Sequence, residues 1–398
     1  MPYPSLEIAS SLISFKSVSG EKDEGAILFI KNFLSDLGFN CFTETFTGSG
    51  SYEVENLYAE IEIPCINHSK NLCFAGHTDV VPEGDLSKWS INPYKPEVKN
   101  GFLIGRGAVD MKGSIACFMS AVKEYLQESS LEKSSSKNKA KISFLITGDE
   151  EADSINGTEK MLKAIYEKGF KIDSCIVGEP TNSEKIGDTI KIGRRGGVSF
   201  ELKINGVQGH VAYPEKAKNP VPIVAEIVDK LSKLRLDNGN DFFQPSNLEV
   251  TTIDVGNSVV NLIPSSAKAK MNIRFNNEQT AISVKQKIEE IIQNTIKNYN
   301  NSFTYELTQI GRVNESFVFP PSDFANLIAK SSEKFAGIKP EFTTTGGTSD
   351  ARFIKNYCEV AEFGLINTTA HKIDEKIAVS DLETLKNIYL EIIKGYFH

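Results

Sequence analysis

Several features are scarce in this sequence of 398 residues. No apolar run reaches the roughly 18–20 residues that a membrane-spanning helix needs. The N-terminal stretch has no basic segment ahead of an apolar core, so we expect neither a membrane partner nor a secretory signal. Basic residues are outnumbered, with 44 Lys and Arg against 52 Asp and Glu and a net charge of −8. Because nucleic-acid binding needs a basic surface, this balance argues against a nucleic-acid partner.

Cysteine is also sparse, and the six cysteines form no C-x-x-C pair. Several lie within apolar runs, as Cys73 and Cys175 do. This placement is typical of small buried residues in a reduced, cytoplasmic protein rather than of a disulfide framework. The rest of the composition is ordinary for a globular protein, with 40% hydrophobic and 24% charged residues. At about 150 residues per domain, the length indicates roughly two to three domains.

The first half of the chain alternates strand-like and helix-like segments. Short apolar runs predict buried strands, and longer segments with apolar residues at helical spacing predict helices. The expected strands are 71–75, 142–147 and 174–177, and the expected helices are 22–37, 113–126 and 158–168. This alternation favours an α/β fold with a mixed central sheet flanked by crossover helices.

After about residue 188 the pattern changes to that of a smaller α+β unit. Its order is β-α-β-β-α, with strands at 198–204, 248–255 and 267–275 and helices at 220–234 and 281–297. Such an order predicts an antiparallel sheet with helices on one face. We therefore expect a catalytic domain in two parts, 1–188 and 301–398, with an inserted domain at 189–300 between them.

Three local signals complete the reading of the chain. The polar stretch 128–139 predicts a surface loop. The α/β pattern resumes with a helix at 322–335 and a strand near 358–363. Ser380 and Glu383 have the S-x-x-E spacing of a capping box, so we expect the last helix to begin at Ser380.

Carboxylates and histidines gather directly after the expected strands. His77 ends one strand with Asp79 two residues later, and Glu150 and Glu151 follow another. In an open α/β sheet, sites lie beyond the carboxyl ends of the strands. Neutral imidazole suits zinc, and adjacent carboxylates strain one another unless a cation or a proton neutralises them. When each cluster is taken alone, a plainer interpretation stays open. The histidine could simply cap a turn, and the carboxylates could form an acidic surface loop.

Three further residues fit the same pattern. Asp110 lies in a glycine-rich stretch before a helix, where a simple N-cap is the alternative. Glu179 follows a third expected strand, and His371 lies near the C-terminus. Two histidines and three carboxylates suit a two-metal site with one bridging carboxylate, in which the cations activate a water and polarise a carbonyl. The coincidence of these clusters favours metal-assisted hydrolysis over the plainer interpretation of each one.

Longer strings around these residues carry a family resemblance. GHTDVVPEGD, GRGAVDMKGSIA, TGDEE, VGEPT and HKIDE resemble the co-catalytic zinc peptidase and deacylase family, with order and spacing kept from about residue 5 to 395. Three more strings resemble motifs of the family members that act on N-succinyl-LL-2,6-diaminopimelate. They are GRRGG, QGHVAYP and TTGGTSDARFI. The resemblance implies a zinc-peptidase-like catalytic domain, an inserted dimerisation domain, and hydrolysis of that amide to succinate and LL-2,6-diaminopimelate in lysine biosynthesis.

The resemblance also implies how the metals are held. It predicts two zinc ions per subunit, which cobalt can replace. One zinc would be bound by His77 and Glu179 and the other by Glu151 and His371, with Asp110 bridging both. Asp79 would orient His77 through its second ring nitrogen.

Two catalytic roles follow from the same resemblance. Glu150 would be the general base that takes a proton from the bridging water and passes it to the leaving amine. His210, in the inserted domain, would reach the partner site of a homodimer and stabilise the oxyanion there. Asn261 would also reach that site. A homodimer is therefore the expected assembly.

The implied substrate carries carboxylates at both ends, and arginine is suited to binding them bidentately. The residues that match the substrate pocket of the family are Arg194, Tyr213, Asn261, Arg274, Gly347, Thr348, Arg352 and Asn367. An acetylornithine deacetylase or a dipeptidase on the same two-metal site is the alternative enzyme. A binding protein without catalysis is the alternative outside the enzymes. Ala152-Asp153 departs from the Gly-Pro usual in the family, which leaves the rate rather than the reaction class open.

Overall fold

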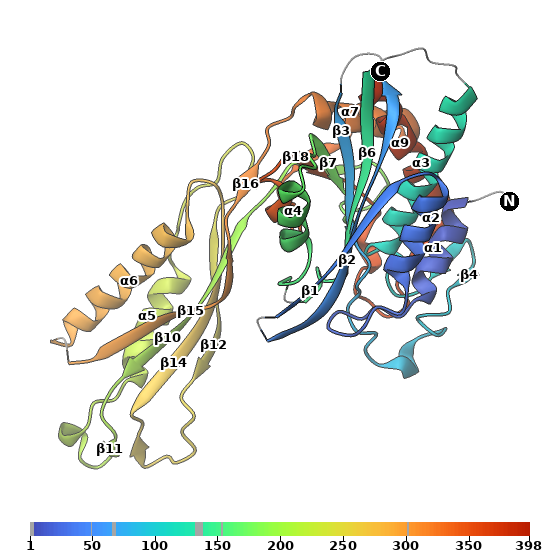
Figure 1. The fold of residues 1–398 in the computed structure, drawn as a ribbon. Coiled ribbons are helices and arrows are strands. Elements are labelled where there is room, and N and C mark those ends of the chain that lie inside the picture. Colours follow the sequence, from blue (N-terminus) through green and yellow to red (C-terminus); the bar gives the residue numbers. More distant parts are fainter. Residues whose placement is uncertain (1–3, 49, 66–68, 132–137, 153, 301) are drawn as a thin grey trace. The chain divides into compact units, whose positions relative to one another are not determined.

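The computed structural model describes residues 4–48, 50–65, 69–131, 138–152, 154–300 and 302–398. The chain forms two compact units (Figure 1). The first consists of Met1–Ile192, Phe319–Thr343 and Ser349–His398, and the second of Gly193–Val318 and Thr344–Thr348. No helix in the described ranges is long and apolar enough to cross a bilayer.

The first unit is built on a mixed sheet of eight strands. Their order across the sheet is β1 (Asn40–Gly48), β2 (Ser51–Cys65), β6 (Asn138–Thr147), β3 (Asn71–His77), β7 (Ser174–Val177), β18 (Glu359–Glu362), β8 (Thr189–Lys191) and β17 (Glu341–Thr343). Strands β6, β3 and β7 are parallel neighbours, so their carboxyl ends meet at one edge of the sheet. The mixed α/β sheet predicted from the sequence is confirmed. The long β1–β2 hairpin was not predicted.

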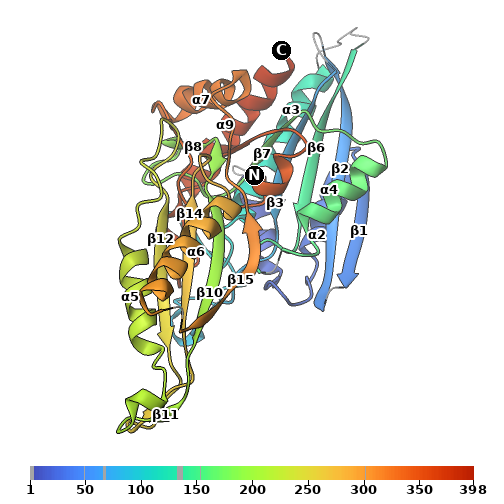
Figure 2. The same cartoon turned by 90° about the vertical axis from the view of Figure 1, so that its left-hand side faces the viewer.

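Helices cover both faces of this sheet. They are α1 (Pro4–Ser14), α2 (Ala26–Asp36), α3 (Lys112–Leu131), α4 (Thr158–Glu167), α7 (Asp323–Ala336), α8 (Ala351–Ile354) and α9 (Val379–Phe397). Figures 1 and 2 show α4 on one face and α1, α2 and α3 on the other. The rings of Phe74 on β3 and Phe118 on α3 stack with centroids 4.6 Å apart. This packing fixes the start of α3 beside the end of β3, where the candidate site lies.

Two local predictions need correction. The last helix begins at Val379 after Ala378, which makes no side-chain cap, so the capping box of Ser380 and Glu383 is not formed. Instead the Glu383 carboxylate accepts a hydrogen bond from Ser5. The expected loop 128–139 is helical at its start because α3 runs to Leu131. Residues 132–137 of that loop and Asp153 lie outside the described residues.

The second unit is an antiparallel sheet of four strands with two helices. The strands are β12 (Asn247–Asp254), β14 (Ser266–Phe275), β10 (Gly196–Asn205) and β15 (Thr304–Asn314), in that order, and the helices are α5 (Val221–Ser232) and α6 (Ala281–Asn298). Alternate residues of β10 are buried against the helices, which gives the unit its own core. The expected β-α-β-β-α order is present, and β15 adds a fourth strand beyond residue 300.

Short elements complete both units. In the first, β19 (Lys376–Ala378), β5 (Phe102–Ile104) and β4 (Glu97–Lys99) form a small sheet, next to the 3₁₀ turns η1 (Leu86–Lys88) and η3 (Asn367–Thr369). In the second, β11 (Gly209–His210) pairs with β13 (Leu262–Ile263) near η2 (Pro214–Lys216), and β9 (Gly193–Arg194) pairs with β16 (Phe317–Val318).

Candidate active site

The candidate site lies in the first unit, where three parallel strands end. His77 is the last residue of β3 and lies opposite Thr147, the last residue of β6. Glu150 and Glu151 lie in the loop that follows β6, and Glu179 lies in the loop that follows β7. Because the carboxyl ends of adjacent parallel strands share an edge, side chains far apart in the sequence meet here.

Two loops bring Asp110 and His371 to the same edge. Asp110 comes just before α3, where Gly113 lies so close to the Ala108 carbonyl that a side chain there would collide with it. His371 lies between η3 and β19 with a φ of 62°, in the left-handed region that residues other than glycine rarely adopt. The backbone is therefore tightly packed at Gly113, and at His371 it has a conformation that the residue adopts only with support from its surroundings.

The two oxygens of Asp110 face two different histidines. Its Oδ1 lies 3.2 Å from Nε2 of His77, and its Oδ2 lies 3.1 Å from Nε2 of His371. Glu151 Oε1 is 2.8 Å from the same nitrogen of His371, and Glu179 Oε1 is 3.8 Å from Nε2 of His77. Asp110 thus lies between two sets of donors, as a bridging carboxylate would.

The donor set fits divalent metal ions. Nε2 of His77 and Oδ1 of Asp110 are buried and have no hydrogen-bond partner, although buried polar atoms normally do. His77, Glu150 and Glu179 form one group whose ligand atoms lie within 4.8 Å of one another, and His77, Asp110 and Glu151 form another. Imidazole nitrogen and carboxylate oxygen are donors that zinc accepts. The two groups share His77, so these residues form one cluster whose donors can hold metal.

The electrostatics of the site also favour a bound cation. Burial opposes the charged form of Asp110, yet the close imidazole rings of His371 and His77 hold the pKa of its carboxyl well below the usual value. The close carboxylates of Asp110 and then Glu151 raise the pKa of His371 to about 10. The carboxylates thus stabilise positive charge on the groups between them. In the metal-free chain, that charge comes from protons on the histidine rings.

Glu150 differs from the other carboxylates of the cluster. Its Oε2 is 4.0 Å from Nε2 of His77, farther than the carboxylates of Asp110 and Glu179. Burial, and then the charge of Glu179, raise the pKa of Glu150 well above the usual value. A carboxyl group that binds a proton this readily next to candidate metal ligands is suited to proton transfer.

Asp79 contacts both the histidine and the glutamate loop. Nδ1 of His77 lies 2.8 Å from the backbone oxygen of Asp79 and 3.7 Å from its carboxylate. The carboxylate itself accepts the backbone N–H groups of Glu150 and Glu151, with Oδ2 at 3.0 and 2.9 Å. Ser19 Oγ donates to the same oxygen at 2.7 Å. Asp79 therefore fixes the Glu150–Glu151 backbone as well as the His77 ring.

One positioning residue was missed by the sequence analysis. Asp149 is fully buried and accepts the backbone N–H groups of Ser154, Ile155 and Asn156, and Tyr52 Oη donates to it at 2.5 Å. It therefore holds the loop that follows Glu150 and Glu151. The available signal was its place as the first of three successive carboxylates that follow a buried strand.

The residues expected to act across a dimer lie together in the second unit. His210 on β11 pairs with Leu262, and the backbone N–H of Val211 donates to the Asn261 carbonyl at 3.1 Å. The rings of His210 and Tyr213 have centroids 5.9 Å apart. His210, Tyr213 and Asn261 are all exposed.

The remaining expected substrate residues are divided between the two units. Arg194 is 6% exposed and donates to the Gly347 carbonyl at 2.9 Å, next to Thr348. Arg274, half-buried on β14, also belongs to the second unit. Arg352 on α8 and Asn367 on η3 belong to the first unit. Each is thus held within its own unit.

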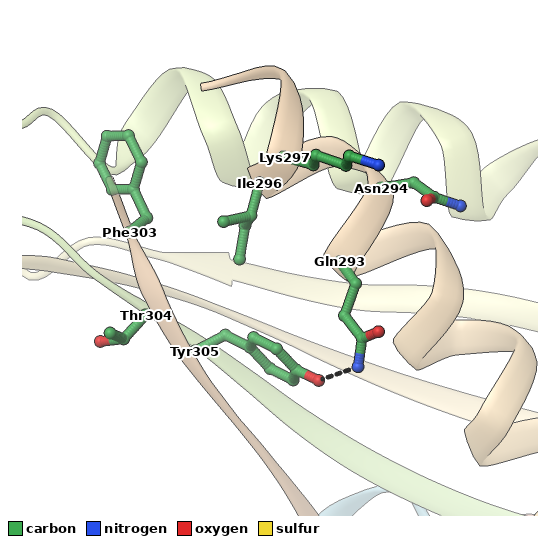
Figure 3. A pocket seen from close by; sticks show the side chains of 7 residues that line it. All are labelled: Gln293, Asn294, Ile296, Lys297, Phe303, Thr304 and Tyr305. Carbon is green, nitrogen blue, oxygen red and sulfur yellow. Dashed lines mark hydrogen bonds between the residues drawn. The ribbon is translucent and has the colours of Figure 1, made fainter. Parts of the chain in front are cut away.

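A separate pocket of about 610 Å³ lies within the second unit, between the end of α6 and the start of β15 (Figure 3). It is lined by Gln293, Asn294, Ile296, Lys297, Phe303, Thr304 and Tyr305. Figure 3 shows the Gln293 amide donating to Tyr305 Oη, at 3.0 Å. None of the lining residues is a histidine, cysteine or carboxylate, so the pocket carries no metal-ligating set.

The fold and the clustered ligands define a metallohydrolase, and the comparisons agree with this class. The model of peptidase family M20/M25/M40 matches residues 73–395, so the chain belongs to this family. Solved structures share the fold. The aminopeptidase PepT from Bacillus cereus has a TM-score of 0.77 at 19% identity, covering 98% of this chain and 97% of that one. The metallo-carboxypeptidase Sso-CP2 from Sulfolobus solfataricus has a TM-score of 0.73 at 20% identity. The match covers 98% of this chain and 99% of that one.

Curated relatives are similar over nearly the whole chain. A succinyl-diaminopimelate desuccinylase from Parvibaculum lavamentivorans is 44% identical, covering 100% of this chain and 96% of the relative. Those from Bradyrhizobium diazoefficiens and Rickettsia rickettsii are each 47% identical to this chain. The first match covers 98% of this chain and 99% of the relative. The second covers 96% of this chain and 97% of the relative. The predicted resemblance to this branch of the family is confirmed.

Proposed function

We propose that this chain is a zinc-dependent amide hydrolase that converts N-succinyl-LL-2,6-diaminopimelate and water to succinate and LL-2,6-diaminopimelate. The observation that carries the proposal is the placement of Asp110 between His77 and His371, with Glu150 alongside. The names of the full-length relatives supply the substrate. The reaction belongs to diaminopimelate and lysine biosynthesis.

Five residues would hold the metals. His77 and Glu179 would bind one zinc ion, Glu151 and His371 the other, and Asp110 both. Zinc at such a site lowers the pKa of water and polarises the amide carbonyl. Cobalt can replace it, because the same imidazole and carboxylate donors bind both metals.

Glu150 carries the proton through the reaction. Its carboxylate accepts a proton from the attacking water and then returns that proton to the nitrogen of the leaving amine. The raised pKa of Glu150 supports this role, since the group must hold the proton between the two steps. Asp79 keeps Glu150 in place by accepting its backbone N–H.

Arginine side chains would bind the substrate carboxylates. Arg194, Arg274 and Arg352 offer forked donors that match a carboxylate, and Tyr213, Asn261, Gly347, Thr348 and Asn367 would complete the recognition. The succinyl carboxylate needs a cationic partner, whereas an acetyl group needs none. This difference separates the proposal from an acetylornithine deacetylase with the same metal site.

The paired test uses zinc-loaded protein with N-succinyl-LL-diaminopimelate in one assay and N-acetylornithine in the other. We expect a preference for the succinyl substrate that is lost in Glu150→Ala. Preference for the acetyl substrate would contradict the assignment of the arginines but not the metal site. Hydrolysis of neither substrate, with two metals bound, would contradict the proposed function itself.

We further propose a homodimer in which His210 and Asn261 reach the partner's site. Apolar side chains beside them are exposed, Val260 at 99% and Val259 at 47%, which supports a protein partner on this surface. If His210 stabilises the oxyanion of the partner's site, His210→Ala lowers turnover by a factor of hundreds while the zinc content stays normal.

Mixed dimers test that arrangement directly. His210→Ala and Glu150→Ala are each expected to be nearly inactive alone. Co-expressed, they form dimers in which one site has both groups, so about a quarter of the wild-type sites return. Mixtures that stay inactive would contradict action across the dimer. We also propose a cytoplasmic location, which the six free cysteines support.

A further inference from the structure

An ion pair with no assigned role is buried beside the candidate metal ligands. Arg106 is 2% exposed and Glu375 is fully buried, with Nη1 and Oε2 2.8 Å apart. Burial of two charges is costly unless their remaining hydrogen-bonding groups are satisfied. The partners of this pair therefore indicate what it does.

Glu375 accepts hydrogen bonds with both of its oxygens. Its Oε2 accepts from Arg106 and from the backbone N–H of Gly107 at 3.0 Å. Its Oε1 accepts from the backbone N–H groups of Val109, at 2.8 Å, and Asp110, at 3.0 Å. One carboxylate thus fixes the backbone that leads into Asp110, the proposed bridging ligand.

Arg106 joins this loop to two others. Its Nη1 also donates to the Lys372 carbonyl, next to His371, and its Nη2 donates to the Pro82 carbonyl, each at 3.2 Å. The guanidinium carbon lies 5.2 Å from the centre of the Trp89 ring, a cation–π contact. The loops after His77, before Asp110 and after His371 therefore share one buried centre.

The His371 loop needs such support. His371 and Asp374 have φ values of 62° and 54°, which are unfavourable for residues with side chains. The Asp374 carboxylate accepts the backbone N–H of Ser90 at 2.8 Å, and Glu375 is the next residue. Contacts from outside the loop therefore hold it in this conformation.

We propose that Glu375 and Arg106 are positioning residues that set the separation of Asp110 and His371, and with it the affinity for the metal ion that these two share with Glu151. Neither residue belongs to the proposed ligand set of that ion. The inference rests on the proposed two-metal function. Such supporting contacts typically change metal affinity or activity by about 10–100-fold when removed.

Glu375→Gln is the sharpest substitution because it preserves size. The amide has one acceptor oxygen, so its NH₂ group must face either Arg106 and Gly107 or the N–H groups of Val109 and Asp110. Either orientation places donors against donors. The Asp110 loop must then shift while the metal-binding side chains themselves stay unchanged.

A matched control is available at the other end of β3. Asn71 is buried and contacts Tyr58, Lys171 and Ser143 through its side chain. It lies six residues before His77, about 20 Å away along the strand. Asn71→Ala therefore lowers stability within the same sheet without disturbing the ligand loops.

The experiment titrates metal-stripped full-length protein with zinc against a competing chelator, and records urea unfolding in parallel. We expect Glu375→Gln to bind one of two zinc ions about 10–100-fold more weakly, and Asn71→Ala to bind both normally although it is less stable. Arg106→Lys, which keeps the charge but loses the fork, is expected to fall between them. At saturating zinc, KM for the succinyl substrate should change less than kcat.

Two outcomes would overturn the inference, and they are distinguishable. If Glu375→Gln is less stable but binds both zinc ions with wild-type affinity, the pair is only structural and the proposed function stands. If the wild-type chain itself binds fewer than two zinc ions, the proposed function fails and this inference fails with it.

Discussion

The carboxylate of Asp79 offers a direct test of how the site is held. Asp79 is 2% exposed, and its Oδ2 accepts from Ser19 Oγ and from the backbone N–H groups of Glu150 and Glu151. Asp79→Asn keeps the shape of the side chain and removes its charge. The amide oxygen can still accept at the Oδ2 position, while the NH₂ group replaces Oδ1, which in the wild type also accepts the Glu150 N–H at 3.1 Å.

The size of the effect follows from these contacts. A hydrogen bond to a charged group contributes about 1.5–3 kcal/mol and a neutral one about 0.5–1.5 kcal/mol, so each bond loses about 1 kcal/mol. The three bonds to Oδ2 therefore weaken by about 3 kcal/mol in total. Since two of them fix Glu150 and Glu151, we expect kcat to fall about 10–100-fold.

The assay compares kcat, KM and zinc content of Asp79→Asn with those of the wild type. The expected result is a lower kcat with KM within about twofold. Ser19→Ala is the control, because it removes one bond to the same oxygen and leaves both glutamate N–H contacts. We expect it to lower stability by about 1–3 kcal/mol with little change in kcat. Wild-type kcat in Asp79→Asn would refute the reasoning.

Two further predictions concern stability. Tyr52→Phe removes the hydroxyl that donates to Asp149, so the free energy of unfolding in urea should fall by about 1.5–3 kcal/mol; an unchanged midpoint would contradict this role for Tyr52. Burial raises the pKa of Asp350 to about 6. The folded, metal-free chain therefore binds a proton at Asp350 more tightly than the unfolded chain does. Its stability consequently falls as pH rises from about 4 to 6. Asp350→Asn should therefore raise the melting temperature above pH 6 but not below pH 4, and equal effects at both pH values would rule out the titration.

The apolar runs predicted the central strands well. Strand β7 matches its expected range, and β3 extends its range only to His77, because short buried strands leave a continuous hydrophobic pattern. The β1–β2 hairpin gave no such signal, since most of β1 is at least partly exposed. The capping box failed because Ser380 lies one residue inside the helix.

The candidate ligands have a clearer signal in the sequence than the residues that hold them in place. Each imidazole or carboxylate at a strand end can be recognised as a candidate ligand from the few residues around it. The contacts that hold them join distant segments instead. Asp79 binds the backbone of Glu151, 72 residues away, and Arg106 binds Glu375 across 269 residues. A backbone N–H carries no residue identity, and an ion pair across so many residues has no fixed spacing, so no sequence pattern reveals these partners.

The most direct test of the central claim is zinc titration of metal-stripped protein, with hydrolysis of N-succinyl-LL-diaminopimelate followed at each addition. We predict two zinc ions per chain and no hydrolysis before zinc is added. We also predict that Asp110→Ala, which lacks the carboxylate placed between both histidines, loses binding of both ions. Full hydrolysis by the stripped protein, or two normal zinc sites in Asp110→Ala, would contradict the account.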